Sequence, residues 1–253
     1  MLGGDFMITS PRNPRLNEVR RLRRRRERRE LGLTTIEGPF LLQEAVAGGA
    51  SITEVFALPG DEDAQAAALE AGAALTMVTA DALPRIASTL NPRGPVAVIE
   101  IPATPVIERV DSVLLWDVAD PGNAGTIVRT AAAFGFQVLA TPESVDMWSP
   151  KVLRAGVGGH FRTPVVQGVQ SLQDLTGVGL IPYATAADGV YVDKVDLSES
   201  SPVVFIIGNE AHGVPSSVTN RTTTLALEMP GGTESLNAAV TGAVFMYLRM
   251  SRR

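Results

Sequence analysis

Residues 112–141 read SVLLWDVADPGNAGTIVRTAAAFGFQVLAT, and this segment decides the fold class. The apolar run over 112–118 predicts a buried strand, the glycine-rich stretch after it predicts a turn, and 125–134 has the apolar spacing of a helix. Another apolar run over 137–141 predicts the next strand. A strand, a crossover helix and a second strand form the unit from which parallel sheets are built. The segment therefore predicts an α/β fold.

The same alternation extends along the chain in both directions. Toward the C-terminus, strands are predicted over 203–207 and 224–227 and a long helix over 236–249. Toward the N-terminus, strands over 35–38, 52–58, 75–78 and 96–101 alternate with helices over 39–47, 63–71 and 80–90. We interpret 1–100 as a small α/β/α domain, the proline-containing 101–110 as a linker, and 111–253 as a second domain. The sheet of the second domain should be mostly parallel and covered on both faces.

Positive charge is concentrated at the start of the chain. Residues 1–30 carry ten arginines and four acidic residues, whereas the remainder carries 12 basic and 23 acidic residues, so the net charge of −5 conceals a basic segment. Residues 17–31, NEVRRLRRRRERREL, predict one helix with Val19 and Leu22 on its apolar face. Guanidinium groups hold phosphates bidentately, so we expect this helix to bind nucleic acid. A solvated helix held by Glu–Arg pairs is the alternative. The candidate contacts are Arg20, Arg21, Arg23, Arg24, Arg25, Arg26, Arg28 and Arg29.

Composition excludes several other classes of protein. The sequence has no cysteine and only two histidines, His160 and His212, which argues against disulfides, a cysteine nucleophile and a metal site. No apolar run approaches the roughly 20 residues that a helix needs to cross a bilayer. The first ten residues lack the basic start and apolar core of a secretory signal. We therefore expect a cytoplasmic protein that binds neither metal nor membrane.

Three glycine-bearing segments each follow a predicted strand. They are DPGNAGTIVRTA at 120–131, IGNEAHG at 207–213 and MPGGTESLN at 229–237. Ligands of open α/β sheets bind beyond the carboxyl ends of the strands, so three such loops can form one site. None of the segments is a P-loop, a dinucleotide-binding fingerprint or a Gly-x-Ser-x-Gly elbow. The chemistry therefore belongs to another class.

The three segments resemble the signature motifs of the SpoU (TrmH) family of RNA ribose methyltransferases, in the SPOUT superfamily. The pattern Asn-x-Gly-x-x-x-Arg-x-Ala is matched by Asn123, Gly125, Arg129 and Ala131. Gly-Asn-Glu is matched at 208–210, and a proline followed by Ser-Leu-Asn at 230 and 235–237. This resemblance covers 113–250. Residues 7–100 resemble, more weakly, the L30e-like substrate-binding domain of many members, through Asn13-Pro14, Glu37-Gly38 and Asn91-Pro92-Arg93-Gly94. Ala211 and Gly156 depart from the pattern, which commonly has glycine and serine there.

The resemblance implies S-adenosylmethionine as cofactor, methylation of a ribose 2'-hydroxyl of RNA, and a C-terminal SPOUT α/β domain with a deep trefoil knot. It also implies a homodimer formed through the C-terminal domain. The residues expected to line the cofactor pocket are Gly208, Met229, Leu236 and Thr185. An arginine stays protonated, so Arg129 is expected to grip the RNA phosphate and polarise the hydroxyl. The other residues expected in the catalytic site are Asn123, Glu210, Ser235 and Asn237, with loop bracing as the alternative role for these four.

The identity of the RNA is a separate question. Ribosomal (23S) RNA is favoured because transfer-RNA members of the family often lack the N-terminal domain, and a transfer-RNA 2'-O-methyltransferase is the alternative. Enzymes that confer antibiotic resistance by modifying ribosomal RNA share the same architecture. A non-catalytic RNA-binding protein is a further alternative, against which the intact Arg129, Glu210 and Asn237 argue.

Overall fold

The computed structural model describes residues 7–89, 91–92, 94–198 and 200–252. The chain forms two compact units, and each is made from two stretches of sequence. The first unit comprises the chain up to Ala103 together with Trp148–Phe161, and the second comprises Thr104–Met147 together with Arg162–Arg253. Residues 1–6, Leu90 and Arg93, on which sequence predictions fell, lie outside the described residues.

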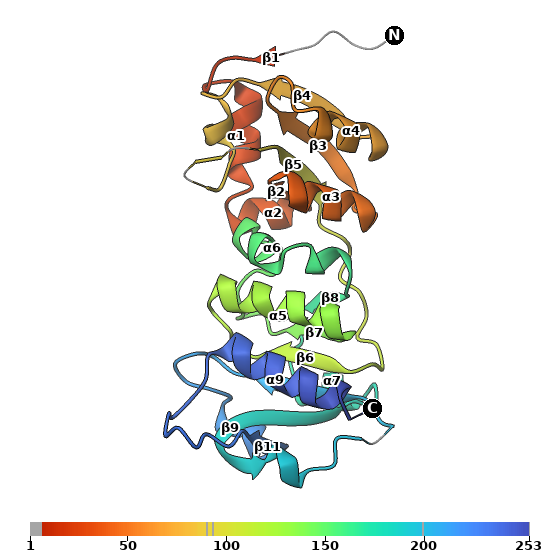
Figure 1. Cartoon of the computed structure of the whole chain (residues 1–253), viewed down its shortest axis with the longest axis vertical. Coiled ribbons are helices and arrows are strands. Elements are labelled where there is room, and N and C mark those ends of the chain that lie inside the picture. The colour runs from red at the N-terminus through yellow and green to blue at the C-terminus, as the bar shows by residue number, and fades with distance from the viewer. Residues whose placement is uncertain (1–6, 90, 93, 199, 253) are drawn as a thin grey trace. The chain divides into compact units, whose positions relative to one another are not determined.

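The first unit is built on a mixed sheet in the order β1-β4-β3-β5-β2 (Figure 1). Its strands are β1 (Met7–Ile8), β2 (Leu33–Glu37), β3 (Ile52–Ala57), β4 (Ala74–Val78) and β5 (Val96–Glu100). Its helices are α1 (Pro14–Arg21), α2 (Arg25–Leu31), α3 (Pro39–Ala47), α4 (Glu62–Glu70) and α6 (Pro150–Gly156), with short 3-10 turns η1 (Leu83–Arg85) and η2 (Gly159–Phe161). Strands β1, β4 and β3 run parallel, and β5 runs antiparallel to both β3 and β2.

Alternate residues of β5 show how the sheet divides the first unit into layers. Val96 and Val98 pack into a cluster with α1 and η1, while Ala97 and Ile99 pack into a cluster with α3 and α4. Successive side chains of a strand point to opposite faces, so these two clusters lie on opposite sides of the sheet. This is the α/β/α arrangement that the sequence predicts.

The basic segment forms two short helices instead of the single helix predicted over 17–31. Helix α1 ends at Arg21, and α2 begins after Arg24, whose backbone is extended at φ −92° and ψ 130°. The break lets Arg28 fold back, so that its side chain is 3% exposed and donates to the carbonyl of Leu22 at 2.7 Å. Val19 and Leu22 are buried, as their apolar spacing predicts. The prediction that Arg28 contacts RNA does not fit its burial.

The helix predicted over 80–90 is wrong apart from η1. Pro84 lies within η1, and a proline removes a backbone donor and clashes with the preceding turn of an α-helix. The chain then turns, and the backbone N–H groups of Ser88 and Thr89 donate to the carboxylate of Glu37 at 2.7 and 3.2 Å. A contact with a distant strand therefore replaces helical hydrogen bonds here.

The second unit is built on a parallel sheet in the order β11-β9-β10-β6-β7-β8. Its strands are β6 (Ser112–Leu115), β7 (Gln137–Ala140), β8 (Val165–Gln167), β9 (Ile181–Tyr191), β10 (Val203–Ile207) and β11 (Thr223–Ala226). Its helices are α5 (Pro121–Phe134), α7 (Leu172–Thr176), α8 (Ser216–Thr219) and α9 (Ala238–Met250), with the 3-10 turn η3 (Val192–Lys194). The parallel sheet confirms the predicted α/β fold. Strand β9 escaped prediction because Pro182, Asp188 and Gly189 interrupt its apolar pattern.

Both faces of this sheet are covered, as predicted. Helices α5 and α9 run side by side on one face (Figure 1), where Phe205 of β10 lies 5.4 Å from the ring of Phe245 on α9. The alternate residues Val204 and Ile206 pack with Leu172 and other residues of α7 and α8. No helix in the described part of the chain is long and apolar enough to cross a membrane.

The helices that follow β6 and β11 begin at residues of the family-like motifs. Helix α5 starts at Pro121 and not at 125, because Asp120 accepts a hydrogen bond from the backbone of Asn123 at 2.7 Å and Pro121 suits the first helical position. The stretch predicted as a glycine-rich turn is therefore the first turn of α5. Asn237 caps α9 by accepting from the backbone N–H groups of Ala239 and Val240.

Candidate active site

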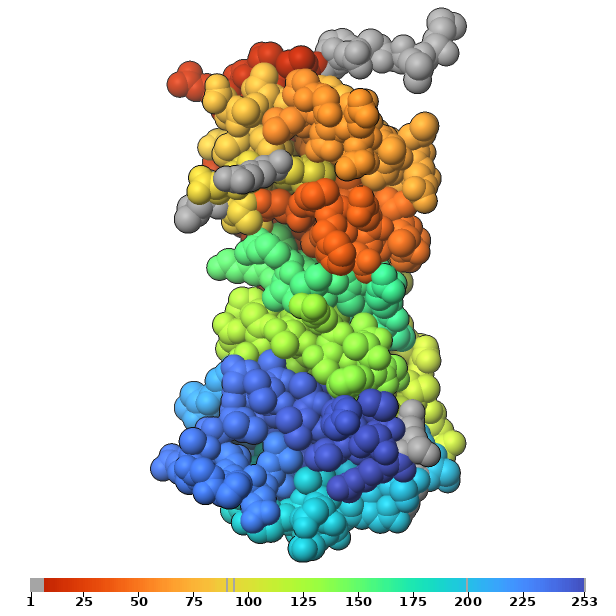
Figure 2. Space-filling model, in the orientation of Figure 1, coloured from red at the N-terminus to blue at the C-terminus, as the bar shows by residue number. Residues whose placement is uncertain are grey.

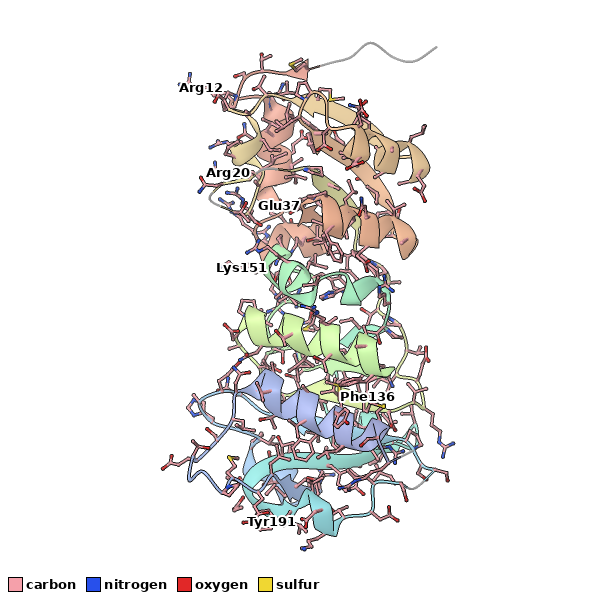
Figure 3. The ribbon with its side chains drawn as sticks, in the orientation of Figure 1. Arg12, Arg20, Glu37, Phe136, Lys151 and Tyr191 are labelled. Atoms are coloured by element: carbon pink, nitrogen blue, oxygen red, sulfur yellow. The ribbon has the colours of Figure 1, made fainter. Side chains whose placement is uncertain are left out.

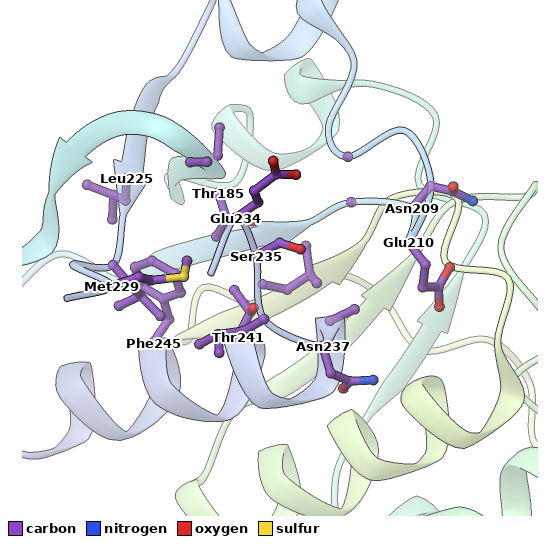
Figure 4. A pocket seen from close by; sticks show the side chains of 18 of the residues that line it. Thr185, Asn209, Glu210, Leu225, Met229, Glu234, Ser235, Asn237, Thr241 and Phe245 are labelled. Carbon is purple, nitrogen blue, oxygen red and sulfur yellow. The ribbon is translucent and has the colours of Figure 1, made fainter. Parts of the chain in front are cut away.

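A pocket of about 550 Å³ lies where the loops after β10 and β11 meet β9 and the first turns of α9 (Figure 4). In this view Asn209 and Glu210 lie at one end, and Leu225 and Met229 lie at the other. The volume falls within the about 300–1,000 Å³ typical of small-molecule sites. The carboxyl ends of parallel strands thus form one site, as expected for an open α/β sheet.

The loop after β10 turns back so tightly that only glycine fits at 208. A Cβ atom there would lie 2.2 Å from the backbone C of Gly213 and 2.3 Å from the N of Val214. The Asn209 side chain holds the turn by accepting from the backbone N–H of Ala211 at 2.9 Å. Gly213 takes the left-handed conformation of this loop, with φ +67°. Ala211 is therefore compatible with the loop, although the family pattern commonly has glycine there.

Asn209 also ties this loop to the one after β6. Its Nδ2 donates to the backbone carbonyl of Asp117 at 2.8 Å. Asp117 has φ +56°, a region that non-glycine residues seldom adopt. Thr141 holds Asp117 there, because its hydroxyl donates to the Asp117 carboxylate at 2.8 Å and accepts from the Asp117 backbone at 3.0 Å. The two loops and the end of β7 therefore form one hydrogen-bonded assembly.

Asn123 joins all three motif segments through its side-chain amide. Its Oδ1 accepts from Nδ2 of Asn237 at 2.8 Å, and its Nδ2 donates to Oε1 of Glu210 at 2.8 Å. Glu210 further accepts from the backbone N–H groups of Ala119 and Asp120, each at 3.2 Å. Asn123 itself is 9% exposed, whereas Glu210 and Asn237 are exposed. These contacts are those of loop-bracing residues.

Glu210 is held in its charged form by this network. Partial burial acts to raise its pKa, but the hydrogen bonds from Asn123 and from the backbone N–H groups of Ala119 and Asp120 together outweigh burial. The pKa of Glu210 therefore lies below its ordinary value. Glu210 is a fixed carboxylate at neutral pH and accepts hydrogen bonds without donating any.

Comparison with known proteins identifies the family. Residues 112–247 match the SpoU rRNA Methylase family, and residues 13–97 match the MRM3-like substrate binding domain. The chain is 31% identical over 245 residues to the 23S rRNA (guanosine(2553)-2'-O)-methyltransferase RlmP of Bacillus subtilis, which covers 95% of this chain and 97% of the relative. The chain belongs to the SpoU rRNA methylase family.

Solved structures related to this SpoU family member differ in how much of the chain they cover. The AdoMet-bound rRNA methyltransferase from Sinorhizobium meliloti covers 98% of both chains with a TM-score of 0.87 and 28% identity. A structure described for 2-OH methylation of C/U34 on tRNA covers 57% of this chain and 99% of its own, with a TM-score of 0.51 and 27% identity. The first comparison therefore includes both units, whereas the second matches little more than half of the chain.

The structure brings together most of the site residues that the SpoU-like motifs predict. Gly208, Met229, Leu236 and Thr185, expected around the cofactor, all line the pocket, as do Glu210, Ser235 and Asn237. Asn123 lies behind the pocket, one hydrogen bond from both Glu210 and Asn237. Arg129 is not among the lining residues. It is exposed on α5, and within the described chain it forms no hydrogen bond or ion pair.

Several lining residues of this SpoU pocket were not singled out from the sequence. Thr241 and Phe245 follow Asn237 at intervals of four on α9, a helical spacing that places them on one face and could have identified them. Glu234 lies within the third motif segment and projects its carboxylate into the pocket (Figure 4). The remaining lining residues without a predicted role are Ala186, Ala187, Ile207, Gly213, Leu225, Leu227 and Ala238, while Asn209 and Ala211 were named only as part of the second motif segment. Those from β9 and β11 carry no chemical signal, because only the strand order places them here.

The pocket of this SpoU protein is acidic. Its charged lining residues are Glu210 and Glu234, and the described lining includes no lysine, arginine or histidine. A site without cations suits a positively charged ligand and opposes phosphate groups. Within the described residues, no three side chains of His, Asp or Glu gather closely enough to hold a metal ion.

Proposed function

We propose that this protein is an S-adenosylmethionine-dependent methyltransferase that acts on the ribose 2'-hydroxyl of 23S ribosomal RNA. The observation that carries the proposal is one acidic pocket formed by the family's motif segments in a chain that belongs to the SpoU rRNA methylase family. The relative RlmP is named for this reaction on 23S rRNA, and the similarity extends over nearly the whole of both chains.

The pocket residues fit the cofactor in size and charge. S-adenosylmethionine supplies an electrophilic methyl group on a positively charged sulfonium. The backbone at Gly208, Met229 and Leu236, together with Thr185, would hold the cofactor, and the Glu234 carboxylate would favour its positive charge. NAD and ATP carry phosphates that this pocket has no cation to bind. The methionine-derived cofactor is therefore preferred over nucleotide cofactors.

The motif residues then have two kinds of role. Asn123, Glu210 and Asn237 fix the loops, because their side-chain polar atoms form hydrogen bonds with one another or with the backbone. Arg129 has a free guanidinium and would bind the RNA phosphate and polarise the attacking hydroxyl. Ser235 lines the pocket and would contact cofactor or ribose. The catalytic group we assign is thus Arg129, with the three others positioning the site.

Ribosomal RNA is favoured over transfer RNA by the first unit. Residues 13–97 match a substrate binding domain named after a ribosomal RNA methyltransferase type, and the structure described for tRNA methylation covers only 57% of this chain. The intact motif residues argue against a non-catalytic RNA-binding protein. The compartment we assign is the cytoplasm, because the relative RlmP, similar over nearly the whole chain, is a bacterial enzyme. We also propose that the first unit has an L30e-like fold.

A homodimer through the second unit is supported by two features of its surface. Helix α9 exposes Val240, Tyr247 and Met250, at intervals of seven and three that place them along one face. Tyr247 also contacts Phe134 of α5, and Arg129 is exposed on that same helix. Apolar side chains grouped on a surface mark interfaces, so a second copy of the chain would cover this face. Arg129 of one protomer would then lie near the pocket of its partner.

We also propose a trefoil knot in the second unit, supported by the path of the chain near the pocket. The segment between β11 and α9 meets the loop after β10, since residues of both line the same pocket. Strand β10 lies between β9 and β6 in the sheet, although it follows them in sequence. In a knotted protein the C-terminal segment passes through a loop of the same chain. The contact between these two segments is consistent with such a passage.

The decisive experiment measures cofactor binding and methyl transfer with the purified full chain. Calorimetry should detect S-adenosylmethionine and S-adenosylhomocysteine and should detect neither NAD nor ATP. With unmodified 23S ribosomal RNA transcript and cofactor carrying a labelled methyl group, label should enter RNA at a 2'-O-ribose position. Binding of the cofactor without methyl transfer to any ribosomal RNA would contradict the assigned substrate, and absence of S-adenosyl binding would contradict the assigned cofactor.

A further inference from the structure

Two arginines of the first unit contact the turn formed by residues 87–89, and two more lie near one of them. Arg23, after α1, donates through Nη2 to the carbonyl of Ala87. Arg154 of α6 donates through Nη1 to the hydroxyl of Ser88 at 2.6 Å. Arg85 of η1 precedes the turn, and both Arg85 and Arg20 act electrostatically on Arg23. Arg154 lies 66 residues beyond the turn in sequence, so folding alone creates this group, which we call the turn cluster.

Glu37 is the carboxylate at this turn, and its hydrogen-bonding capacity is already used. Its Oε2 accepts from the backbone N–H of Ser88 at 2.7 Å, from the Ser88 hydroxyl at 2.8 Å and from the backbone N–H of Thr89 at 3.2 Å, and its Oε1 accepts from the Thr89 hydroxyl. Burial acts to raise the pKa of Glu37, but these bonds outweigh it and the pKa lies below its ordinary value. Within the described chain, no ion pair joins a carboxylate to any arginine of the turn cluster.

The turn cluster therefore carries four positive charges beside a single carboxylate, Glu37, which forms no ion pair with any of them. Burial lowers the pKa of Arg23, and the neighbouring charge of Arg20 and Arg85 lowers it further, against the opposite effect of Glu37. Arg85 donates through Nη2 to Asn17 at 3.0 Å, while its Nε is buried and has no partner within the described chain. A buried donor without an acceptor costs free energy. An anion beside these guanidinium groups would offset their mutual repulsion and would accept from their exposed N–H groups.

Three other arginines near the N-terminus differ from the turn cluster because carboxylates of the fold already pair with them. Arg21 pairs with Glu27 at 2.7 Å, and Arg26 pairs with Glu30 at 2.7 Å. Arg15 pairs with Glu18 at 2.8 Å and also with Glu54. These arginines stabilise the helices and contribute little net positive charge. Arg20, in contrast, extends outward from α1 (Figure 3).

We propose that Arg20, Arg23, Arg85 and Arg154 form a binding site for the phosphodiester backbone of the RNA substrate. Guanidinium groups bind phosphate oxygens bidentately, and a site with several of them can hold one or two adjacent phosphates. This inference rests on the proposed function, since it requires an RNA substrate. It assigns two arginines outside the N-terminal basic segment to RNA binding and excludes Arg21, Arg26 and Arg28 within it.

The test compares two double variants that remove the same amount of charge. Arg20→Gln/Arg85→Gln alters the turn cluster, and Arg12→Gln/Arg26→Gln alters two exposed arginines outside it. Affinity for unmodified 23S ribosomal RNA transcript is measured by filter binding over a series of KCl concentrations. We expect the cluster variant to bind about tenfold more weakly or worse, and its salt slope to fall by about 0.7–0.9 for each phosphate that it no longer neutralises. The control should keep the wild-type slope.

Further measurements distinguish a phosphate-binding site from a role of these arginines in folding, cofactor binding or chemistry. Cofactor affinity and melting temperature should be unchanged in both variants, and turnover at saturating RNA should stay near wild type while KM for RNA rises. The single variant Arg85→Lys retains charge and should keep most of the slope. Equal slopes for the cluster variant and the control would overturn the phosphate site. Failure of the wild-type protein to bind ribosomal RNA would instead overturn the proposed function.

Discussion

Asn123 is the residue on which the geometry of the site depends most. An amide can donate and accept at once, and Asn123 does so toward Glu210 and Asn237 respectively. An aspartate there would place a second carboxylate beside Glu210, and an alanine would remove the one link between Glu210 and Asn237. One side chain thus couples three segments that are separated by 87 and 114 residues in sequence.

Arg129 differs from Asn123, because this motif residue forms no hydrogen bond or ion pair within the described chain. We expect Arg129→Ala and Arg129→Lys both to reduce methyl transfer by about a hundredfold or more, because lysine cannot reproduce the bidentate fork and one preorganised charge-stabilising group contributes on this scale. Single-turnover assays at saturating RNA would isolate chemistry from binding. Cofactor affinity should be nearly unchanged, because Arg129 does not line the pocket.

Arg221→Ala is the matched control for this variant, since Arg221 is another exposed arginine of the second unit. It should retain wild-type turnover. If Arg129→Ala methylates RNA at a rate close to that of Arg221→Ala, Arg129 has no catalytic role and the proposed mechanism is wrong.

At the scale of secondary-structure elements, a buried ion pair joins the end of α9 to the start of β6. Arg249 and Asp111 are each 1% exposed, with Nε and Oδ2 2.7 Å apart. Asp111 also accepts from the backbone N–H of Val203, where β10 begins, and Arg249 donates to the carbonyls of Leu197 and Ser201. The C-terminal helix is thereby fixed to two strands and to the loop between β9 and β10.

We expect Arg249→Met to lower the free energy of unfolding by about 3–5 kcal/mol, because it leaves the Asp111 carboxylate buried without its cation. The double variant Asp111→Leu/Arg249→Met should recover part of this loss, since removing both charges avoids an unpaired buried ion. Urea denaturation followed by circular dichroism measures both values. A double variant no more stable than Arg249→Met would show that the backbone hydrogen bonds, and not the ion pair, hold the helix end.

At the scale of the whole molecule, we expect the exposed face of α9 to form the interface of the proposed homodimer. In the space-filling view this helix, in the darkest blue, lies at the surface (Figure 2). We expect Tyr247→Arg to convert a dimer into a monomer, because Tyr247 is 53% exposed in the centre of the apolar face and a buried unpaired charge opposes association. Sedimentation velocity would report a mass near the 26.7 kDa of one chain.

Leu69→Arg is the matched control, because Leu69 is 84% exposed and lies in the first unit. It should leave the dimer intact. Methyl transfer should fall with dissociation in Tyr247→Arg if Arg129 serves the partner's pocket. A dimeric Tyr247→Arg protein would place the interface elsewhere, and an active monomer would contradict a shared site.

Sequence patterns alone predicted the α/β class, the strands β6, β7, β10 and β11, and the motif segments that follow three of these strands. These features follow from local rules: apolar periodicity, glycine and proline at turns, and capping residues at helix starts. Helix α3 was predicted over 39–47 and is observed at Pro39–Ala47, where Pro39 occupies the first helical turn. Local rules failed at 80–90 and within the basic segment, because distant side chains there compete for backbone groups.

The contacts between distant residues became known from the folded structure. The structure assigned the segment 148–161 to the first unit, put Thr185 of β9 and Phe245 of α9 in one pocket, and brought Arg23 and Arg154 to one turn. It also divided the arginines of the basic segment into those that pair within the fold and those that stay available to an anion. The reason is physical: periodicity is fixed by neighbours in the chain, whereas strand order, burial and charge pairing depend on contacts between residues far apart in sequence.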